Sequence, residues 1–90
     1  MNLPYDNIEK QVILSKLMEN FEKGKEYKEE EVYKILKSKG IDDFALFCRE
    51  LVNFGYFNKD SYKSLYWVKT KKLSVEELEK IREWGKEKAF

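Results

Sequence analysis

The fold is decided by residues 43–68, which read DFALFCRELVNFGYFNKDSYKSLYWV. The first half of this stretch repeats apolar residues at the i, i+3, i+4 and i+7 spacing that marks one face of a helix. These residues are Phe44, Phe47, Cys48 and Leu51. We therefore predict a helix over about Asp43 to Phe54, ended by Gly55, with these four side chains in the core.

The second half of the stretch predicts a β-hairpin. Aromatic and β-branched residues dominate two short runs, Tyr56–Asn58 and Leu65–Val68, and the polar residues Lys59–Ser64 lie between them. Side chains alternate across a strand, so one ring of the Tyr66–Trp67 pair faces the core and the other faces outward. We expect the Trp67 ring to close the hairpin onto the preceding helix.

Two more helices are expected upstream. Apolar residues at three- and four-residue spacing predict the first over about Asn7 to Phe21, capped by Asp6 or Asn7. Its apolar face comprises Ile8, Val12, Leu14, Leu17, Met18 and Phe21. Tyr27 lies in a short extended segment. The second helix spans about Glu29 to Lys39. Its first three residues are glutamates, whose negative charge suits the positive end of the helix dipole. Its inward side chains are Val32, Ile35 and Leu36.

A final helix follows the hairpin. Ser74 and Glu77 have the spacing of a capping box, and Leu73 and Leu78 that of a hydrophobic staple across it. The residues of its apolar stripe are Val75, Leu78, Ile81 and Trp84.

These elements predict an α+β, mainly α fold. It is a winged helix-turn-helix, with three helices plus a β-hairpin wing, and it carries an additional C-terminal helix. Residues 1–7 form an N-terminal arm and residues 8–72 the winged-helix domain. Residues 73–90 form the C-terminal helix, packed on the domain or on a dimer partner. Ninety residues suffice for one domain and are too few for two.

Composition excludes several classes of protein. The net charge of +1 excludes a globally basic nucleic-acid binder, although residues 59–72 hold five lysines against one aspartate. No apolar run is long enough to span a bilayer or to act as a secretory signal, so we expect no membrane contact. The single cysteine, Cys48, forms no internal disulfide, and a reducing cytoplasmic location is the expectation.

The residue types argue against an enzyme. The chain has no histidine, no cluster of metal-ligand spacing and no glycine-rich phosphate loop, so we expect no cofactor and no metal. Cys48 lies on an apolar stripe, which favours a buried, inert thiol over a nucleophile. Helix-start electrostatics explains Glu29, Glu30 and Glu31 more simply than a catalytic carboxylate cluster does.

Three stretches of the chain resemble a bacterial family, the domain of unknown function numbered 2087. They are Tyr27-Lys28-Glu29-Glu30-Glu31-Val32, the segment from Asp43 to Gly55, and Tyr66-Trp67. The resemblance covers roughly residues 8–68 and implies a winged helix, in a family some of whose members are fused to arsenic-repressor-type transcription regulators. Cys48 and Val68 stand where the family pattern has arginine, so two positive charges are absent from the surface that would face DNA.

The sharper functional hypothesis is a transcription-regulatory module that binds double-stranded DNA. The second helix of a helix-turn-helix lies in the major groove, and here it would offer Arg49 to guanine and Asn53 to adenine. The phosphate contacts would be Lys59, Lys63, Lys71 and Lys72. The same helix, together with Asp42 directly before it, also carries Asp43 and Glu50. Because these carboxylates repel phosphates, we expect a monomer to bind weakly.

The alternative is a non-enzymatic protein-interaction or dimerisation module that retains the fold without binding DNA. A lysine-rich loop is more often a solvated surface than a binding site. In the final helix, Leu78, Ile81 and Trp84 either pack on their own domain or form the interface with a second copy. The partners left open by the sequence are DNA, a homodimer and a separate regulator.

Overall fold

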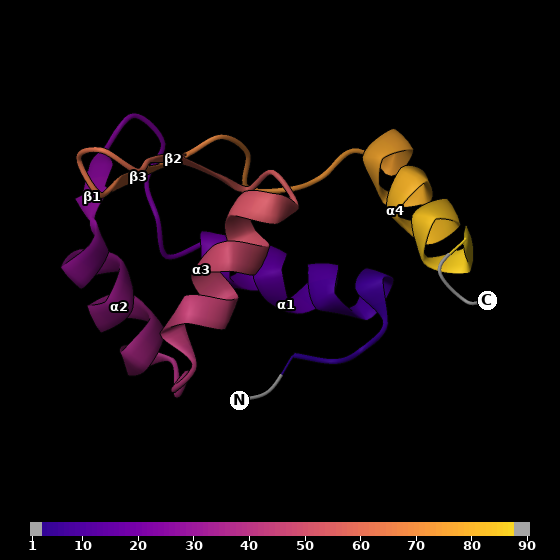
Figure 1. The fold of residues 1–90 in the computed structure, drawn as a ribbon, viewed down its shortest axis with the longest axis horizontal. Helices are drawn as coiled ribbons and strands as arrows, with labels where there is room; N and C mark the ends of the chain where they lie inside the picture. The colour runs from indigo at the N-terminus through magenta and orange to yellow at the C-terminus, as the bar shows by residue number, and fades with distance from the viewer. Residues whose placement is uncertain (1–2, 88–90) are drawn as a thin grey trace.

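The computed structural model describes residues 3–87, and their side chains as far as Glu83. These residues form four helices and three strands, which confirms the α+β, mainly α part of the predicted fold class (Figure 1). In chain order they are α1 (Asn7–Met18), β1 (Glu26–Lys28), α2 (Glu29–Ser38), α3 (Phe44–Asn53), β2 (Phe57–Asp60), β3 (Leu65–Val68) and α4 (Val75–Glu87). No helix within this part of the chain has the length and apolar character needed to cross a membrane.

The three strands form one antiparallel sheet in the order β1-β3-β2. Tyr66 lies on the central strand and pairs with Tyr27 on one side and with Lys59 on the other. The sequence predicted an extended segment at Tyr27. Its pairing with Tyr66 of β3 depends on the tertiary structure, because an edge strand of three residues has too little pattern of its own to identify a partner.

The second strand of the hairpin has the predicted bounds, whereas the first, β2, begins one residue later and ends two residues later than predicted. Tyr56 is a corner and not a strand residue, since its N–H donates to the Leu51 carbonyl at 2.9 Å and closes the end of α3. The turn is set by Asp60, whose Oδ1 accepts from the backbone N–H groups of Tyr62 at 3.0 Å and Lys63 at 3.1 Å. This local bonding is typical of an aspartate that starts a turn.

Buried aromatic rings join the helices to the sheet. The Phe21 ring lies edge-on to Tyr27, with centroids 5.1 Å apart, and edge-on to Phe57, with centroids 4.9 Å apart. The predicted core stripe of α3 is confirmed, since Phe47, Cys48 and Leu51 are buried and Phe44 is half-buried against the core. Edge-to-face packing of this kind adds stability beyond the apolar area that it buries.

The first helix differs from the prediction in length and in orientation. It ends at Met18, and Phe21 reaches the core from the segment that follows. Val12 was expected to face inward but is 61% exposed, whereas Gln11 is buried. The Tyr56 hydroxyl donates to Gln11 Oε1 at 2.8 Å, which makes burial of this polar side chain tolerable.

The expected helix caps are present in part. Asp6 caps α1 by accepting from the N–H groups of Ile8 at 2.8 Å and Glu9 at 3.1 Å. At α2, the Glu31 side chain accepts from the Lys28 N–H at 3.1 Å. The second bond of a capping box is missing, because the ammonium group of Lys28 has no acceptor for a backbone N–H. The full capping box predicted before α4 is confirmed.

The helix α4 lies beside α1 at one end of the molecule, apart from α2 and the sheet (Figure 1). Leu73 is buried and Leu78 packs against the core, as the staple requires. Val75 was placed on the apolar stripe but is 73% exposed, because the helix turns this position away from α1.

The ring that closes the hairpin onto the core is Tyr66, and the prediction for Trp67 was wrong. Tyr66 and Val68 are buried on the face of β3 that meets the helices, and Trp67 lies half-buried on the alternate face. Alternation alone permits either assignment, and the packing of Phe57 against Tyr66 selects this one.

Candidate nucleic-acid interface

A shallow hollow of about 280 Å³ lies where α2, α3 and the hairpin meet. Its rim includes Arg49 and Asn53 from α3 and Lys59 from β2. Cys48 and Tyr66 form its floor, and Glu29 and Tyr33 of α2 form the opposite wall. We call this feature the α3–β2 hollow. It brings both residues predicted to contact bases beside one of the four lysines predicted to contact phosphates.

Helical periodicity puts Arg49 and Asn53 on the rim. They are four residues apart on the outward side of α3, opposite the buried Phe47 and Leu51, and both are exposed. Lys59 arrives from β2, two residues after the buried Phe57 and therefore on the same face of the sheet. Arg49 and Asn53 are therefore exposed on α3, as predicted, with Lys59 beside them at the rim.

The position of Lys59 is restrained by the ring beneath it. Its ammonium nitrogen lies 5.3 Å from the centroid of the Tyr66 ring, within the range of a cation–π contact. Because Lys59 is directly opposite Tyr66 in the strand register, this contact needs no unusual backbone geometry. A positive charge is thus held at the mouth of the hollow.

The floor of the hollow is chemically inert at neutral pH. The pKa of the Cys48 thiol is raised to about 11, mainly by burial and secondly by the nearby Glu29 carboxylate. The pKa of Tyr66 is raised to about 12, mainly by burial and secondly by the nearby Cys48. The thiolate is the nucleophilic form of cysteine. Cys48 is therefore buried and remains a thiol near pH 7, as its place on the apolar stripe predicted.

Sequence reasoning missed Glu29 as a residue of this site. Glu29 accepts a hydrogen bond from the Tyr33 hydroxyl, which, with burial, raises the pKa of Tyr33. Its own N–H donates to the Ser64 carbonyl at 3.3 Å, which ties the start of α2 to the hairpin turn. The hollow therefore combines two cationic side chains with one carboxylate. No local pattern could have revealed this, because Glu29 is twenty residues from Arg49 and thirty from Lys59.

The predicted phosphate contacts are divided between two places. Lys59 and Lys63 belong to the hairpin, at the rim of the hollow and in the β2–β3 turn. Lys71 and Lys72 lie beyond the opposite end of β3, where Thr70 Oγ1 donates to the Lys72 carbonyl at 2.9 Å. The strand β3 therefore separates the two pairs of lysines. The number of charges in residues 59–72 does not reveal this separation.

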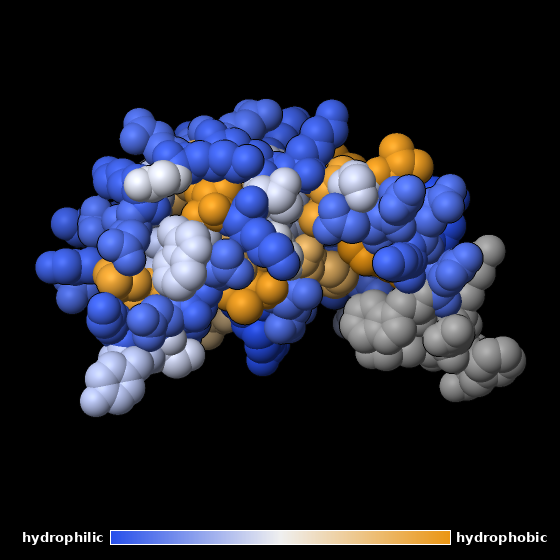
Figure 2. Space-filling model, turned by 90° about the horizontal axis from the view of Figure 1, so that it is seen from above, coloured by the Kyte–Doolittle hydropathy of each residue, from blue (hydrophilic) through white to orange (hydrophobic). Residues whose placement is uncertain are grey.

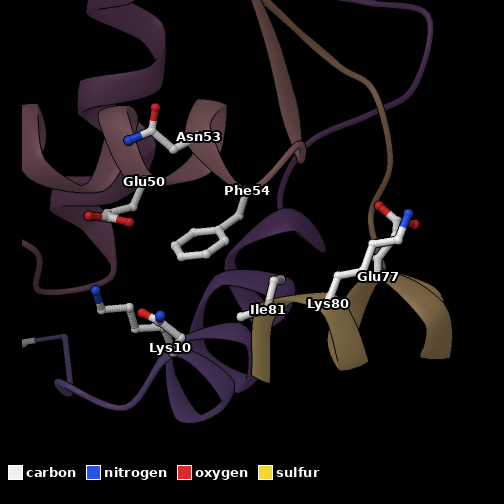
Figure 3. Close-up of a pocket in the computed structure, with 8 residues that line it drawn as sticks. Lys10, Glu50, Asn53, Phe54, Glu77, Lys80 and Ile81 are labelled. Carbon is white, nitrogen blue, oxygen red and sulfur yellow. The ribbon is translucent and has the colours of Figure 1, made fainter. Parts of the chain in front are cut away.

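A second and larger depression, of about 780 Å³, lies between α1, the end of α3 and α4. Phe54 and Ile81 supply its apolar surface, and Figure 3 shows the Phe54 ring directed into the space between the three helices. We call it the α4 groove. Asn53 lines both the α4 groove and the α3–β2 hollow.

The residues predicted to form a dimer interface are placed as follows. Leu78 and Ile81 are half-buried and pack against the core of their own domain. The side chain of Trp84 lies outside the described residues. Among the described residues, no group of three or more histidine, cysteine, aspartate or glutamate side chains is arranged to hold a metal ion.

Comparison with known proteins identifies one family. A family model described as "Uncharacterized protein conserved in bacteria (DUF2087)" matches residues 1–68, which ends at the last residue of β3 and leaves α4 outside. No curated protein and no solved structure matches the chain.

Proposed function

We propose that this chain, which belongs to the DUF2087 family, is a winged-helix module that binds double-stranded DNA, weakly as a monomer. The order helix, strand, helix, helix, strand, strand, with β3 central in the sheet, is the order expected of a winged helix-turn-helix. In this assignment α2 and α3 are the helix pair, and the β2–β3 hairpin is the wing. The short connection between the helices contains Gly40, whose φ of 78° suits a tight turn.

The observation that carries the proposal is the grouping of Arg49, Asn53 and Lys59 around the α3–β2 hollow. In a helix-turn-helix the second helix enters the major groove. Arg49 would donate two hydrogen bonds to guanine, and Asn53 would form a donor–acceptor pair with adenine. Lys59 would contact the backbone beside them and fix the register of the helix on the duplex.

The charge of this face explains why binding by a monomer is weak. Lys59 and Lys63 can each neutralise a phosphate, while Glu29 opposes them from across the hollow. Two phosphate contacts correspond to a slope of about −2 in a plot of log affinity against log salt. Affinity should therefore fall roughly 12-fold between about 50 and 200 mM salt.

Fluorescence anisotropy with a labelled duplex across a salt series tests the proposal. Lys59→Ala is expected to make the salt slope shallower by about 1, because one phosphate contact is lost. Arg49→Ala is expected to weaken binding and to reduce discrimination between sequences, because a paired contact with a base is worth about 1–3 kcal/mol. Lys23→Ala is the matched control, since this lysine is also exposed but lies in the segment between α1 and β1.

Two results would contradict the proposal, the first by excluding DNA binding and the second by excluding the α3–β2 hollow as its site. One is the absence of binding at about 50 mM salt with tens of micromolar protein, since non-specific binders reach dissociation constants of about 10⁻⁴–10⁻⁶ M at higher salt. The other is an equal loss of affinity in Lys59→Ala and Lys23→Ala, which would mean that the hollow has no special role.

The second candidate is a protein-interaction module with the same fold. It is favoured by the carboxylates around α3, where Asp42 is exposed, Glu50 is half-exposed and Glu29 lines the hollow. These charges would suit a basic partner better than a phosphate backbone. Pull-down with a separate regulator, together with no DNA binding, is the outcome that selects this candidate.

Self-association through α4 is a separate proposal. Sedimentation velocity of the full chain over a range of concentrations tests it, with Ile81→Asp as the variant and Val75→Asp on the same helix as the control. A mass that stays monomeric in the wild type would remove Leu78, Ile81 and Trp84 as an interface.

A further inference from the structure

The α4 groove has the dimensions of a small-molecule site. Its volume of about 780 Å³ falls within the range of about 300–1,000 Å³ typical of such sites. Three separate helices build it, so its shape depends on the tertiary fold and not on one element. Figure 2 shows apolar side chains exposed along the seam where α4 meets the rest of the domain, on the face seen from above.

The apolar surface of the groove suits a flat ring. Phe54 is the residue that caps α3, and its half-buried ring contacts the core on one side while facing the groove on the other. Ile81 faces the same space from α4 (Figure 3). An aromatic ring between the two would bury apolar area on both of its faces, and aromatic pairs add a further preference for Phe54.

The charged side chains of the groove balance one another. Lys10 and Glu50 lie together at one end, and Glu77 and Lys80 at the other (Figure 3). The two carboxylates disfavour a ligand with net negative charge, and the two lysines disfavour one with net positive charge. A ligand that carries both charges meets a partner for each.

The end formed by α1 and α3 is the better place for a zwitterionic group. The ammonium nitrogen of Lys10 lies 6.0 Å from the centroid of the Phe54 ring, so a ligand ring on Phe54 brings its polar group close to Lys10. At the other end, Glu77 Oε1 already accepts the Ser74 N–H at 3.2 Å in the capping box. Glu50 is therefore the carboxylate more available to an ammonium group.

We propose that the α4 groove binds a small aromatic zwitterion of the α-amino acid class. Its ring lies between Phe54 and Ile81, its carboxylate faces Lys10 and its ammonium group faces Glu50. This site is distinct from the α3–β2 hollow and does not require DNA to be bound. Asn53 lines both, so the occupant of the groove touches a residue assigned to base contact.

Titration of the ¹⁵N-labelled full chain followed by NMR tests the site with four probes that share an indole ring. The probes are L-tryptophan, tryptamine, indole-3-acetate and indole. L-tryptophan is expected to bind with a dissociation constant of order 1 mM. Its shifts should concentrate on the amides of Lys10, Asn53, Phe54 and Ile81. Tryptamine and indole-3-acetate should each bind about two- to fivefold more weakly, the factor that an exposed ion pair contributes.

The variant Glu50→Gln separates charge recognition from ring binding. It removes the partner of the ammonium group, so L-tryptophan should lose its advantage over indole-3-acetate while still shifting the Phe54 amide. Glu79→Gln, an exposed glutamate of α4 outside the groove, is the matched control and should keep the wild-type ranking. Equal affinity for all four probes, or shifts confined to residues outside the groove, would overturn the proposal. DNA binding plays no part in these measurements, so they stand whether or not the proposed function fails.

Discussion

The buried contact between Gln11 and Tyr56 yields the most quantitative prediction. Tyr56 is fully buried, Gln11 is 4% exposed, and the tyrosine hydroxyl donates to Gln11 Oε1 at 2.8 Å. Gln11 Nε2 donates in turn to the Asn7 carbonyl at 2.8 Å. This chain of bonds connects α1 to the corner from which the hairpin starts. It therefore helps to set the position of β2 relative to the helices.

The losses caused by removing the two partners separately should not be additive. Tyr56→Phe keeps the ring but leaves Gln11 Oε1 buried without a donor, which should lower the free energy of unfolding by about 1–3 kcal/mol. Gln11→Met leaves the hydroxyl without an acceptor and should cost a similar amount. The double variant contains neither orphaned group. Its loss should therefore be smaller than the sum of the two, by roughly 0.5–3 kcal/mol.

Urea unfolding followed by far-ultraviolet circular dichroism measures these differences. A loss of about 2 kcal/mol is readily detected, since a domain of this length has a total stability of about 5–13 kcal/mol. Tyr62→Phe is the control, because that tyrosine is 98% exposed and its change should stay within about 0.5 kcal/mol. Additive losses in the double variant would refute the reasoning, because they would mean that the two side chains are energetically independent.

The remaining predictions concern alkaline stability, the α4 cap, the charge in the hollow and the groove. Burial raises the pKa of Cys48 to about 11 and of Tyr66 to about 12, from ordinary values of 9.0 and 10.0. The folded state therefore holds these protons more tightly than the unfolded chain. The stabilisation from these two groups should be fully present below about pH 9 and be lost progressively between about pH 9 and 12, as measured by urea unfolding at each pH. Ser74→Ala should destabilise α4 by about 0.5–2 kcal/mol, seen as faster amide exchange in α4 but not in α2. Glu29→Gln should tighten DNA binding in the anisotropy assay, because it removes the carboxylate from the hollow while keeping an acceptor for the Tyr33 hydroxyl. Glu19→Gln, an exposed glutamate outside the hollow, is the control and should leave DNA binding unchanged. If both the groove and the DNA assignments hold, saturating L-tryptophan should weaken DNA binding, and unchanged anisotropy curves would show that the two sites are independent.

Local pattern was sufficient wherever a short segment determines its own structure. The i, i+3, i+4 spacing identified the buried face of α3, and the Ser74–Glu77 spacing identified the cap of α4. Both depend on contacts within a few residues, which the sequence displays directly. The outward direction of Arg49 and Asn53 followed from the same periodicity, because the side opposite a buried stripe faces solvent.

The errors arose where the apolar pattern allowed two answers. In α1, Val12 was predicted to face the core but is exposed, and Gln11, which was not among the predicted core residues, is buried. The reversal depends on Tyr56, forty-five residues away, which supplies the hydrogen bond that Gln11 needs when buried. In β3, either Tyr66 or Trp67 could have faced inward, and the register against Phe57 and Tyr27 decided the matter.

The sequence by itself therefore determined the α+β, mainly helical class, the helices and the exposed face of α3, because each depends on residues close together in the chain. Only the tertiary structure decided which groups meet at a site. It placed Glu29 opposite Lys59, separated Lys63 from Lys72, and opened a groove between α4 and the end of α3. Electrostatic and apolar contacts act over a few ångströms in space, and separation along the chain does not report that distance.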